Sequence, residues 1–352
     1  MTPDVALSGR TRRAFDFGAG GAFVDHMPWE VRHQRGVHLP QIGWWLDATR
    51  AQARSFVSHA HSDHIGGHRE IVATRATASL MRLRIPGKRR ETILNYGEPW
   101  GAEFGCEFTL HPAGHIFGSA MLRAVTDQGS LLYTGDFKLR PSLAAEPCDA
   151  PRADVLIMET TFGLPKYVLP PQAKIEADLV DFCRTALAEN VTPVLYGYSL
   201  GKTQELVQIV GRAGLPIMLH AHGYRVTKHY AELGMKLPPF ALLDPRAYAG
   251  HVIIAPPMSG QEEPLTWIHP KRTAVATGWA LDRSTRYQSG TDAAFPLSDH
   301  ADFPDLLALV DRVQPKVVYT LHGFAKEFAA TLRQRGIEAW AIGQGNQMEL
   351  SL

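Results

Sequence analysis

The histidine-rich segment HAHSDH, residues 59–64, constrains this chain more than any other part of its sequence. It comes just after the run RSFV, which is typical of a strand, and two glycines follow it closely. At the end of a strand, the HxH spacing directs two imidazoles to one side, and the DH pair adds a carboxylate and a third imidazole at a neighbouring point. Imidazole and carboxylate groups are ligands of zinc, manganese and iron. A histidine-rich surface loop is the alternative, but this spacing favours a metal-binding loop.

Three further segments place a metal-binding side chain beside glycine at an expected strand end. They are HPAGHIFGSA with His115, LLYTGDF with Asp136 and VVYTLHGF with His322. Each residue taken alone would more often be a buried, hydrogen-bonded histidine or an aspartate of a turn. Their shared position at strand ends favours one common site, in which an aspartate such as Asp136 is able to bridge two cations.

Composition and charge indicate an ordinary globular protein. The chain has 352 residues, of which 45% are hydrophobic and 20% charged, and its net charge is +1, so nucleic-acid binding would need local basic surface. The three cysteines are far apart and form no CxxC pair, which argues against a disulfide framework and fits a reducing compartment. The N-terminal residues contain no apolar run of the length of a signal peptide or membrane span. We therefore expect a cytoplasmic protein with no membrane association.

The order of strand-like and helix-like patterns along the sequence predicts one α/β domain interrupted by a second one. Short β-rich runs alternate with Gly and Pro through the first 160 residues, which indicates stacked sheets. From about residue 172 a helical pattern begins, and strands and helices alternate up to about 280. The segment 302–323 then returns to a helix, a strand and a loop that carries histidine. The expected divisions are 1–171, an insertion over 172–285, and 286–352.

The ordered motifs resemble those of a known family. HxHxDH, AGH and TGD, with WLD (Asp47) before them, resemble the motifs of the metallo-β-lactamase superfamily. METTFG (Glu159), PLSDHAD (His300) and YTLHG (His322) resemble three further motifs of its β-CASP nuclease branch. The resemblance spans nearly the whole chain, and the wording around LDATRAQARSFVSHAHSDH looks most like bacterial ligase-associated DNA exonucleases.

This resemblance implies an αββα sandwich whose metal cleft is covered by an inserted β-CASP α/β domain. It also implies two divalent metal ions, zinc or manganese. The ligands it implies are His59, His61 and His115 for one metal and Asp63, His64 and His322 for the other, with Asp136 bridging them. Asp47 would then orient a ligand histidine, a task that metal sites commonly assign to a carboxylate.

His300 and Glu159 are the expected acid and its partner. The leaving oxygen of a cleaved phosphodiester needs a proton, and His300 is the candidate donor. The carboxylate of Glu159 would keep that imidazole protonated and oriented. Without the resemblance, a capping or core histidine and a solvent-facing strand-end acid would be the ordinary interpretations.

Two segments are candidates for phosphate contacts. YGYSLGKTQEL nearly spells a P-loop but is one residue short, which excludes an ATP site. A helix that starts there, with Ser199 and Lys202, could hold a backbone phosphate, and an ordinary glycine-capped helix start is an equally good interpretation. MRLRIPGKRR gathers five basic residues, among which Arg89 and Arg90 could follow phosphates. A solvated basic loop is the alternative there.

The function expected from these features is that of a metal-dependent DNA exonuclease acting in DNA repair. Its substrate would be DNA that is single-stranded or has free ends, and the resemblance adds a DNA ligase and a helicase as partners. An RNA endo- or exonuclease is the first alternative, because histidine at the position of His322 accompanies RNA-cleaving members of the family. A small-molecule hydrolase is disfavoured by the insertion and by the His300–Glu159 pair. A catalytically inactive nucleic-acid-binding subunit is disfavoured by the complete set of ligands.

Overall fold

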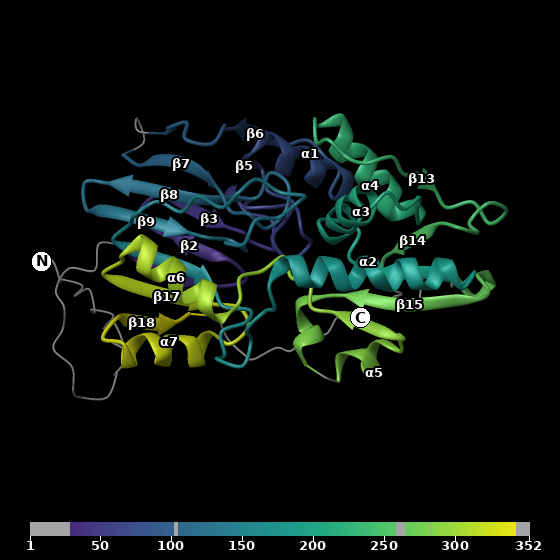
Figure 1. Cartoon of the computed structure of the whole chain (residues 1–352). Coiled ribbons are helices and arrows are strands. Elements are labelled where there is room, and N and C mark those ends of the chain that lie inside the picture. The colour runs from purple at the N-terminus through teal and green to yellow at the C-terminus, as the bar shows by residue number, and fades with distance from the viewer. Residues whose placement is uncertain (1–28, 102–104, 258–264, 283, 343–352) are drawn as a thin grey trace, which may run out of the picture.

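The structure, a computed structural model, describes residues 29–101, 105–257, 265–282 and 284–342. Within these ranges the strands form three six-stranded sheets (Figure 1). Two sheets stack on each other as a sandwich, and the third belongs to the inserted part on the right of Figure 1. Among the described helices, none has the length and apolar character that crossing a bilayer requires.

The sandwich consists of two sheets with helices outside them. The first sheet runs in the order β1 (Arg32–His33), β2 (Val37–Leu39), β3 (Trp44–Leu46), β4 (Arg54–Phe56), β5 (Glu70–Ala73), β6 (Arg90–Ile93). The second runs in the order β18 (Glu338–Ala341), β17 (Val317–Leu321), β10 (Val155–Glu159), β9 (Gly129–Tyr133), β8 (Ala120–Thr126), β7 (Glu107–Pro112). The helices are α1 (Arg75–Arg84), α6 (Phe303–Val313) and α7 (Ala325–Gln334).

Strand β10 shows why the layers stack in this way. Its sequence VLIME is buried at every position. Val155 and Ile157 pack in the core between the two sheets, whereas Leu156 and Met158 pack with α6 and α7 on the other face. A strand covered on both faces needs an unbroken apolar run, because successive side chains point to opposite sides. On the outside of the first sheet, α1 buries its apolar side against β5. The expected αββα sandwich is therefore confirmed.

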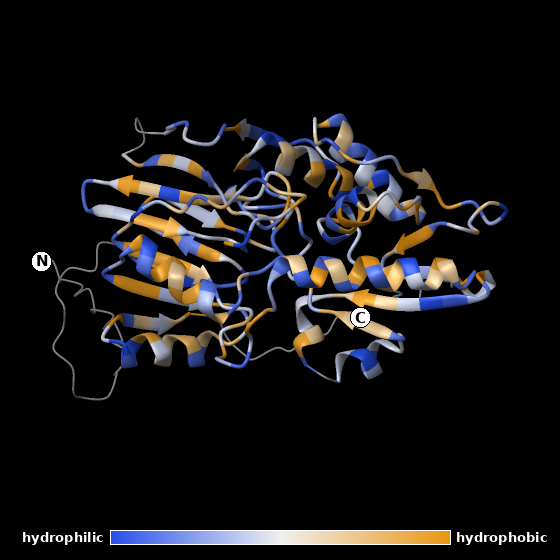
Figure 2. Cartoon of the chain, in the orientation of Figure 1, coloured by the Kyte–Doolittle hydropathy of each residue, from blue (hydrophilic) through white to orange (hydrophobic). Residues whose placement is uncertain are grey.

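The inserted part is a parallel sheet with its own core. The order is β13 (Ala241–Leu242), β12 (Ile217–Leu219), β14 (Val252–Ala255), β11 (Thr192–Tyr196), β15 (Lys271–Ala276), β16 (Ala293–Phe295). Its helical segments are α2 (Gln172–Ala188), α3 (Lys202–Arg212), α4 (Ala221–Glu232), α5 (Thr285–Ser289) and the 3-10 turns η2 (Leu265–Trp267) and η3 (Gly278–Leu281). Figure 2 shows apolar and polar residues interspersed along α2, and the buried ones recur at helical spacing: Ile175, Leu179, Cys183 and Ala186.

The far boundary of the insertion differs from the expected one. Helix α2 begins at Gln172, as the sequence indicates, but the inserted sheet continues past 285. Strand β16 pairs in parallel with β15, and Leu297 packs in the core of the inserted sheet. The short run AAF of β16 carries too little apolar signal to be recognised as a strand, so the sequence places this boundary too early.

The two parts meet closely at the turn between β11 and α3. Leu200 in this turn and Tyr230 of α4 share an apolar cluster with β5 and α1 of the sandwich. Gly201 has a φ of +91°, and a Cβ there would lie 2.4 Å from Cγ2 of Ile116. Only glycine fits so close an approach at this φ. The turn is thereby held against the loop that carries His115.

Candidate metal centre

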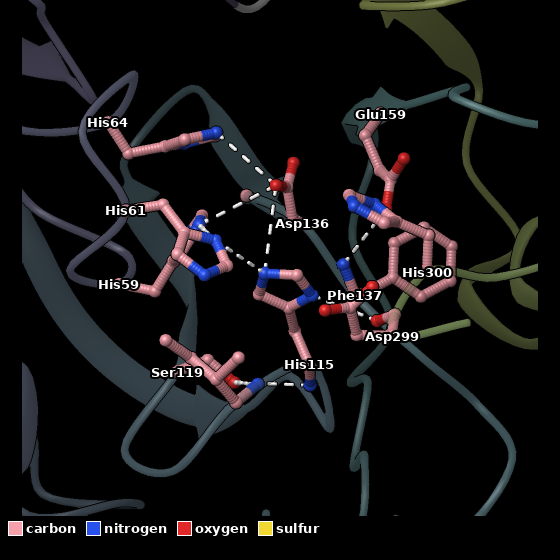
Figure 3. A network of polar contacts seen from close by, with 12 residues as sticks. His59, His61, His64, His115, Ser119, Asp136, Phe137, Glu159, Asp299 and His300 are labelled. Carbon is pink, nitrogen blue, oxygen red and sulfur yellow. Dashed lines mark hydrogen bonds and ion pairs between the residues drawn. The ribbon is translucent and has the colours of Figure 1, made fainter. Parts of the chain in front are cut away.

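Loops from both sheets of the sandwich bring the predicted ligands together. Residues 59–64 follow β4, His115 follows β7, Asp136 follows β9 and His322 follows β17. Figure 3 shows the imidazoles of His59, His61, His64 and His115 around the carboxylate of Asp136. The predicted residues therefore meet at one place, although they are spread over more than 260 positions of the sequence, from 59 to 322.

The first group consists of His59, His61, His115 and Asp136. Nδ1 of His61 lies 3.0 Å from Nε2 of His59 and 3.1 Å from Nε2 of His115. The nearer oxygen of Asp136 lies 3.5 Å from Nε2 of His59. One ligand atom from each of the four residues lies within 4.8 Å of the others. Three imidazoles and a carboxylate converging in this way suit a divalent metal such as zinc.

The second group lies beside the first and is more open. Nε2 of His64 is 3.3 Å from Oδ2 of Asp136 and 3.7 Å from Oδ2 of Asp63. The ring of His322 lies 5.6 Å from that of His64. The side chain of Asp63 is 75% exposed, and His322 is exposed as well. The carboxylate of Asp136 lies between the two groups, close to His59 of the first and His64 of the second.

In four of the histidines, the ring nitrogen that points away from the cluster has a hydrogen-bond partner. Nδ1 of His115 donates to the backbone oxygen of Asp299 at 2.8 Å, and Nε2 of His61 donates to the backbone oxygen of Leu200 at 3.1 Å. Nδ1 of His59 contacts Ser58 Oγ at 2.9 Å, and Nδ1 of His64 contacts Asp47 Oδ2 at 2.9 Å. A carbonyl oxygen only accepts, so the contacts of His115 and His61 leave the lone pair of their other nitrogen facing the cluster.

Asp47 has the geometry of an orienting carboxylate. It is 4% exposed, and its Oδ1 accepts the backbone N–H of Ser58 at 2.7 Å. Its Oδ2 accepts the hydroxyl of Tyr133 at 2.9 Å as well as facing His64. Gly135, with φ +54°, gives the room for this packing, because a Cβ there would lie 2.5 Å from Ser58.

The electrostatics keep His59, His61, His115 and Asp136 in the forms that bind cations. His64 differs, because burial opposes its charged form but Asp136 and Asp63 outweigh burial and raise its pKa well above the usual value, so a cation has to displace its proton. Burial lowers the pKa of His59 and His61, and it lowers the pKa of His115 to about 4 with the help of His300, so these imidazoles are neutral near pH 7. Burial opposes ionisation of Asp136, but the neighbouring His64 and His300 hold its pKa well below the usual range. Neutral imidazoles and an ionised carboxylate are the states that coordinate a metal.

His300 and Glu159 form a pair at the edge of the cluster. Nδ1 of His300 lies 2.8 Å from Oε1 of Glu159, and its ring lies 4.9 Å from that of His115. Glu159 is 1% exposed and also accepts the backbone N–H groups of Phe137 and Thr161 at 3.1 Å each. Burial opposes the charged imidazole, yet Glu159 and then Asp136 raise the pKa of His300 to about 10. The carboxylate is fixed, and it holds a protonated histidine.

A buried ion network links the inserted part to this site, and the sequence did not reveal it. Lys138 Nζ lies 2.8 Å from Oε1 of Glu205, and Lys202 Nζ lies 3.3 Å from Oε2 of Glu205. Lys202 Nζ is also 3.6 Å from Oδ1 of Asp299. Asp299 in turn holds His115 through its backbone oxygen and directly precedes His300. In the sequence, Lys138 lies two residues after Asp136, Asp299 directly precedes His300, and Lys202 was expected to contact phosphate instead.

This network corrects the expected phosphate contact of Lys202. Its side chain is 1% exposed and pairs with two carboxylates, so it is occupied in holding the site together. Ser199 is half-buried in the same turn, and its backbone oxygen accepts Nε2 of Gln204 at 3.0 Å. The phosphate contact of the Ser199 hydroxyl stays a prediction.

The structure does not bring Arg89 and Arg90 to the metal cluster. The Arg89 side chain is 3% exposed and donates to the backbone oxygen of Ile85, so it cannot follow a phosphate chain. Arg90 is 78% exposed and lies 3.7 Å from Glu70. It begins β6, at the amino ends of the parallel strands β4 to β6, whereas the cluster follows the carboxyl end of β4. A basic composition does not reveal which of its side chains are buried.

Comparisons with known proteins agree with the fold and show similarity to metal-dependent hydrolases. Residues 293–342 match the family described as "RMMBL: Zn-dependent metallo-hydrolase RNA specificity domain". A solved structure, "Crystal Structure of a Protein of Unknown Function from Enterococcus faecalis V583", shares the fold with a TM-score of 0.56 and 15% identity, covering 83% of this chain and 79% of that one.

Three curated proteins show similarity in sequence. A "Probable DNA ligase" of Opitutus terrae is 52% identical over 93% of this chain and 32% of its own length. An "RNase J-like protein" of Methanocaldococcus jannaschii is 29% identical over 51% of this chain and 50% of its own length. "RNase aCSPSF2" of Saccharolobus solfataricus is 26% identical over 47% and 40%, respectively. The matched part of the chain thus spans 32% to 50% of the length of these relatives. These similarities agree with the resemblance of the chain's motifs to the β-CASP nuclease branch of the metallo-β-lactamase superfamily.

Proposed function

We propose that this chain is a metal-dependent DNA exonuclease. The observation that carries the proposal is the position of the His300–Glu159 pair, with a ring separation of 4.9 Å between His300 and His115 of the ligand cluster. Cleavage of a phosphodiester needs both charge stabilisation on the phosphoryl group and a proton for the leaving oxygen. The ligand cluster supports the first requirement, and the adjacent imidazolium supports the second.

The proposed site takes two divalent cations, zinc or manganese. The seven side chains that would hold them are His59, His61, Asp63, His64, His115, Asp136 and His322. The fit rests on donor chemistry: backbone oxygens leave the lone pairs of His115 and His61 facing the cluster, and the ionised carboxylate of Asp136 lies beside both groups of ligands. When bound, the cations withdraw charge from the phosphoryl group and lower the pKa of a water molecule beside it.

The residues of the chain itself position and transfer the proton. Glu159 accepts the Nδ1 proton of His300, which leaves Nε2 of this imidazolium to donate to the leaving oxygen. Asp47 orients His64, and the backbone oxygens of Asp299 and Leu200 orient His115 and His61. The inserted part contributes Leu200, so it takes part in shaping the site.

The choice of DNA rests on the extent of one similarity. The probable DNA ligase matches 93% of this chain at 52% identity. This supports action on DNA in repair, together with a DNA ligase and, by family resemblance, a helicase. The resemblance of the N-terminal third to ligase-associated exonucleases supports cutting from an end. The separated cysteines support a cytoplasmic location.

RNA is the second candidate substrate. Residues 293–342, which include His300 and His322, match a family described by RNA specificity, and two of the relatives are named as RNases. This alternative shares the site and the chemistry, and it differs only in which strand enters the cleft.

One assay distinguishes these candidates. End-labelled linear single-stranded DNA, the matched linear RNA and a circular form of the DNA are each incubated with the chain and manganese or zinc, and the products are sized over time. We expect mononucleotides or a ladder from linear DNA, slower cleavage of RNA and no cleavage of the circle. Rapid cutting of the circle would show an endonuclease, and faster cleavage of RNA would overturn the choice of DNA.

A further inference from the structure

We infer that the inserted part contains a subsite for one unpaired nucleobase of the substrate strand. This inference rests on the proposed function. The site is a pocket of about 370 Å³ between strands β11 and β15 and helix α5. Its volume lies near the lower end of the ~300–1,000 Å³ that small-molecule sites span. It is separate from the metal cluster, whose residues are absent from its lining.

The lining of the pocket suits a base better than a phosphate. Tyr196, Tyr198 and Trp279 supply aromatic rings, and several threonine and serine residues supply hydroxyl groups. Among the described lining residues there is no carboxylate, which would repel a nucleic-acid backbone. The one lysine of the lining, Lys271, already donates its Nζ to the backbone oxygen of Leu265 at 2.7 Å. Aromatic rings with neutral hydrogen-bonding groups are the surfaces on which single-stranded bases stack.

Two contact paths connect this pocket to the reacting end of the site. The ring of Trp279 lies 4.8 Å from that of Phe162, which lies 6.3 Å from that of His300. Tyr198 belongs to the turn whose Leu200 accepts the hydrogen bond of His61 at 3.1 Å. The pocket therefore adjoins the side of the cluster where His300 stands. Because His300 protonates the leaving oxygen, the base that enters the pocket belongs to the leaving-group side of the cleaved bond.

Tyr198 is the residue best placed to meet the base. Tyr198 is exposed, with 52% of its surface accessible, whereas Trp279 is half-buried against Phe162 and Tyr167. An exposed aromatic ring beside a pocket offers a face on which an unpaired base can stack. A base stacked there has to leave the stack of a duplex, so the subsite selects a single strand at this position.

The test combines removal of the Tyr198 ring from the protein with removal of single bases from the substrate strand. Single-stranded oligonucleotides carry one abasic residue at each position in turn, in DNA and in RNA form. Their Kd is measured by fluorescence anisotropy for the metal-loaded His300→Ala chain, which we expect to bind without cutting. We expect one abasic position to weaken binding by ~5- to 150-fold, the range that loss of one stacked base gives. Tyr198→Ala should weaken binding of the intact strand similarly, and Tyr198→Phe should retain it.

The coupling between the two changes decides the outcome. With Tyr198→Ala, the sensitive abasic position should cost no further affinity, because both changes remove the same contact. Trp340→Ala is the matched control, since Trp340 is also 52% exposed but lies on the edge strand β18 of the sandwich. Additive effects, or equal sensitivity at all positions, would overturn the base subsite while strand binding persists. Absence of binding to either kind of strand would overturn the proposed function together with it.

Discussion

The imidazoles of the candidate centre are oriented by groups that contact the ring nitrogens pointing away from the cluster. Asp47 is the clearest case, because its Oδ2 receives both His64 and the hydroxyl of Tyr133 while its Oδ1 receives the backbone of Ser58. Partners of this kind fix the tautomer of a ligand histidine and raise its basicity. Their loss therefore reduces metal affinity without removing a ligand.

Asp47→Asn tests this role. The amide keeps the size of the side chain but removes its charge, so we expect metal affinity to fall ~10- to 100-fold. Titration of the metal-free chain with zinc, followed by calorimetry, measures the change. Tyr133→Phe is the control, because it removes one hydrogen bond to Asp47 and leaves His64 in contact. Unchanged affinity in Asp47→Asn would show that Asp47 only supports the fold of its own turn.

His300→Ala separates proton transfer from metal binding. We expect the variant to keep its metals and its affinity for the strand but to lose ~10²- to 10⁴-fold in turnover, as removal of a general acid does. Elemental analysis and single-turnover cleavage on the same preparation give both quantities. His300 lies close enough to His115 and Asp299 to join a metal site, so loss of metal in this variant would assign it as a ligand.

The sequence indicated site residues that lie a few positions apart, but it did not indicate contacts between residues far apart in the chain. The spacing HxHxDH predicts which side chains converge, because the geometry of a strand end is set within a few residues. The ion pair of Lys138 with Glu205 joins positions 67 residues apart, and no spacing in the sequence indicates it. Arg89 was misjudged for a related reason, since burial depends on what the fold packs against a side chain.

The turn from β11 to α3 is the element through which the inserted part acts on the metal centre. Leu200 binds His61, Gly201 touches Ile116, and Lys202 reaches Asp299. The two lysines and two carboxylates of the buried network balance in charge, so removal of one member leaves a buried charge without its counter-ion. Such a loss typically costs ~3–5 kcal/mol.

Lys202→Met tests the network. The substitution removes the ammonium and keeps a side chain of similar length, so we expect the free energy of unfolding to fall by ~3 kcal/mol and turnover to fall because Asp299 loses a partner. Chemical denaturation and the cleavage assay measure both. Lys174→Met on α2 removes a surface pair with Asp178, where Lys174 is 64% exposed, and should cost at most ~1 kcal/mol. Equal stability in the two variants would contradict a structural role for Lys202.

Elements with long regular patterns could be predicted, and short ones could not. Helices α2, α3 and α6 show apolar residues at helical spacing over 17, 11 and 11 residues, so their identity is evident from the sequence. Strand β16 is only three residues long and none of them is fully buried, which is why the insertion was expected to end too early.

The sandwich provides the predicted metal ligands, and the inserted part provides residues that pack around them. The chain has a net charge of only +1, so attraction of a nucleic acid depends on the site itself and on contacts near it. Family resemblance supplied the order of the motifs and the fold, whereas the base pocket depends on strands and a helix that meet only in the folded inserted part. That pocket could not be predicted from the sequence.

We propose that the strand-end histidines and aspartates hold two cations, with Asp136 shared between the two groups of ligands, and that cleavage requires both cations. Elemental analysis of metal-loaded chain, measured beside cleavage of single-stranded DNA, tests it directly. We expect close to two zinc or manganese ions per chain, loss of cleavage after chelation with recovery on re-addition, and fewer bound ions in Asp136→Asn. A chain that cleaves at full rate with one ion or none would contradict the claim.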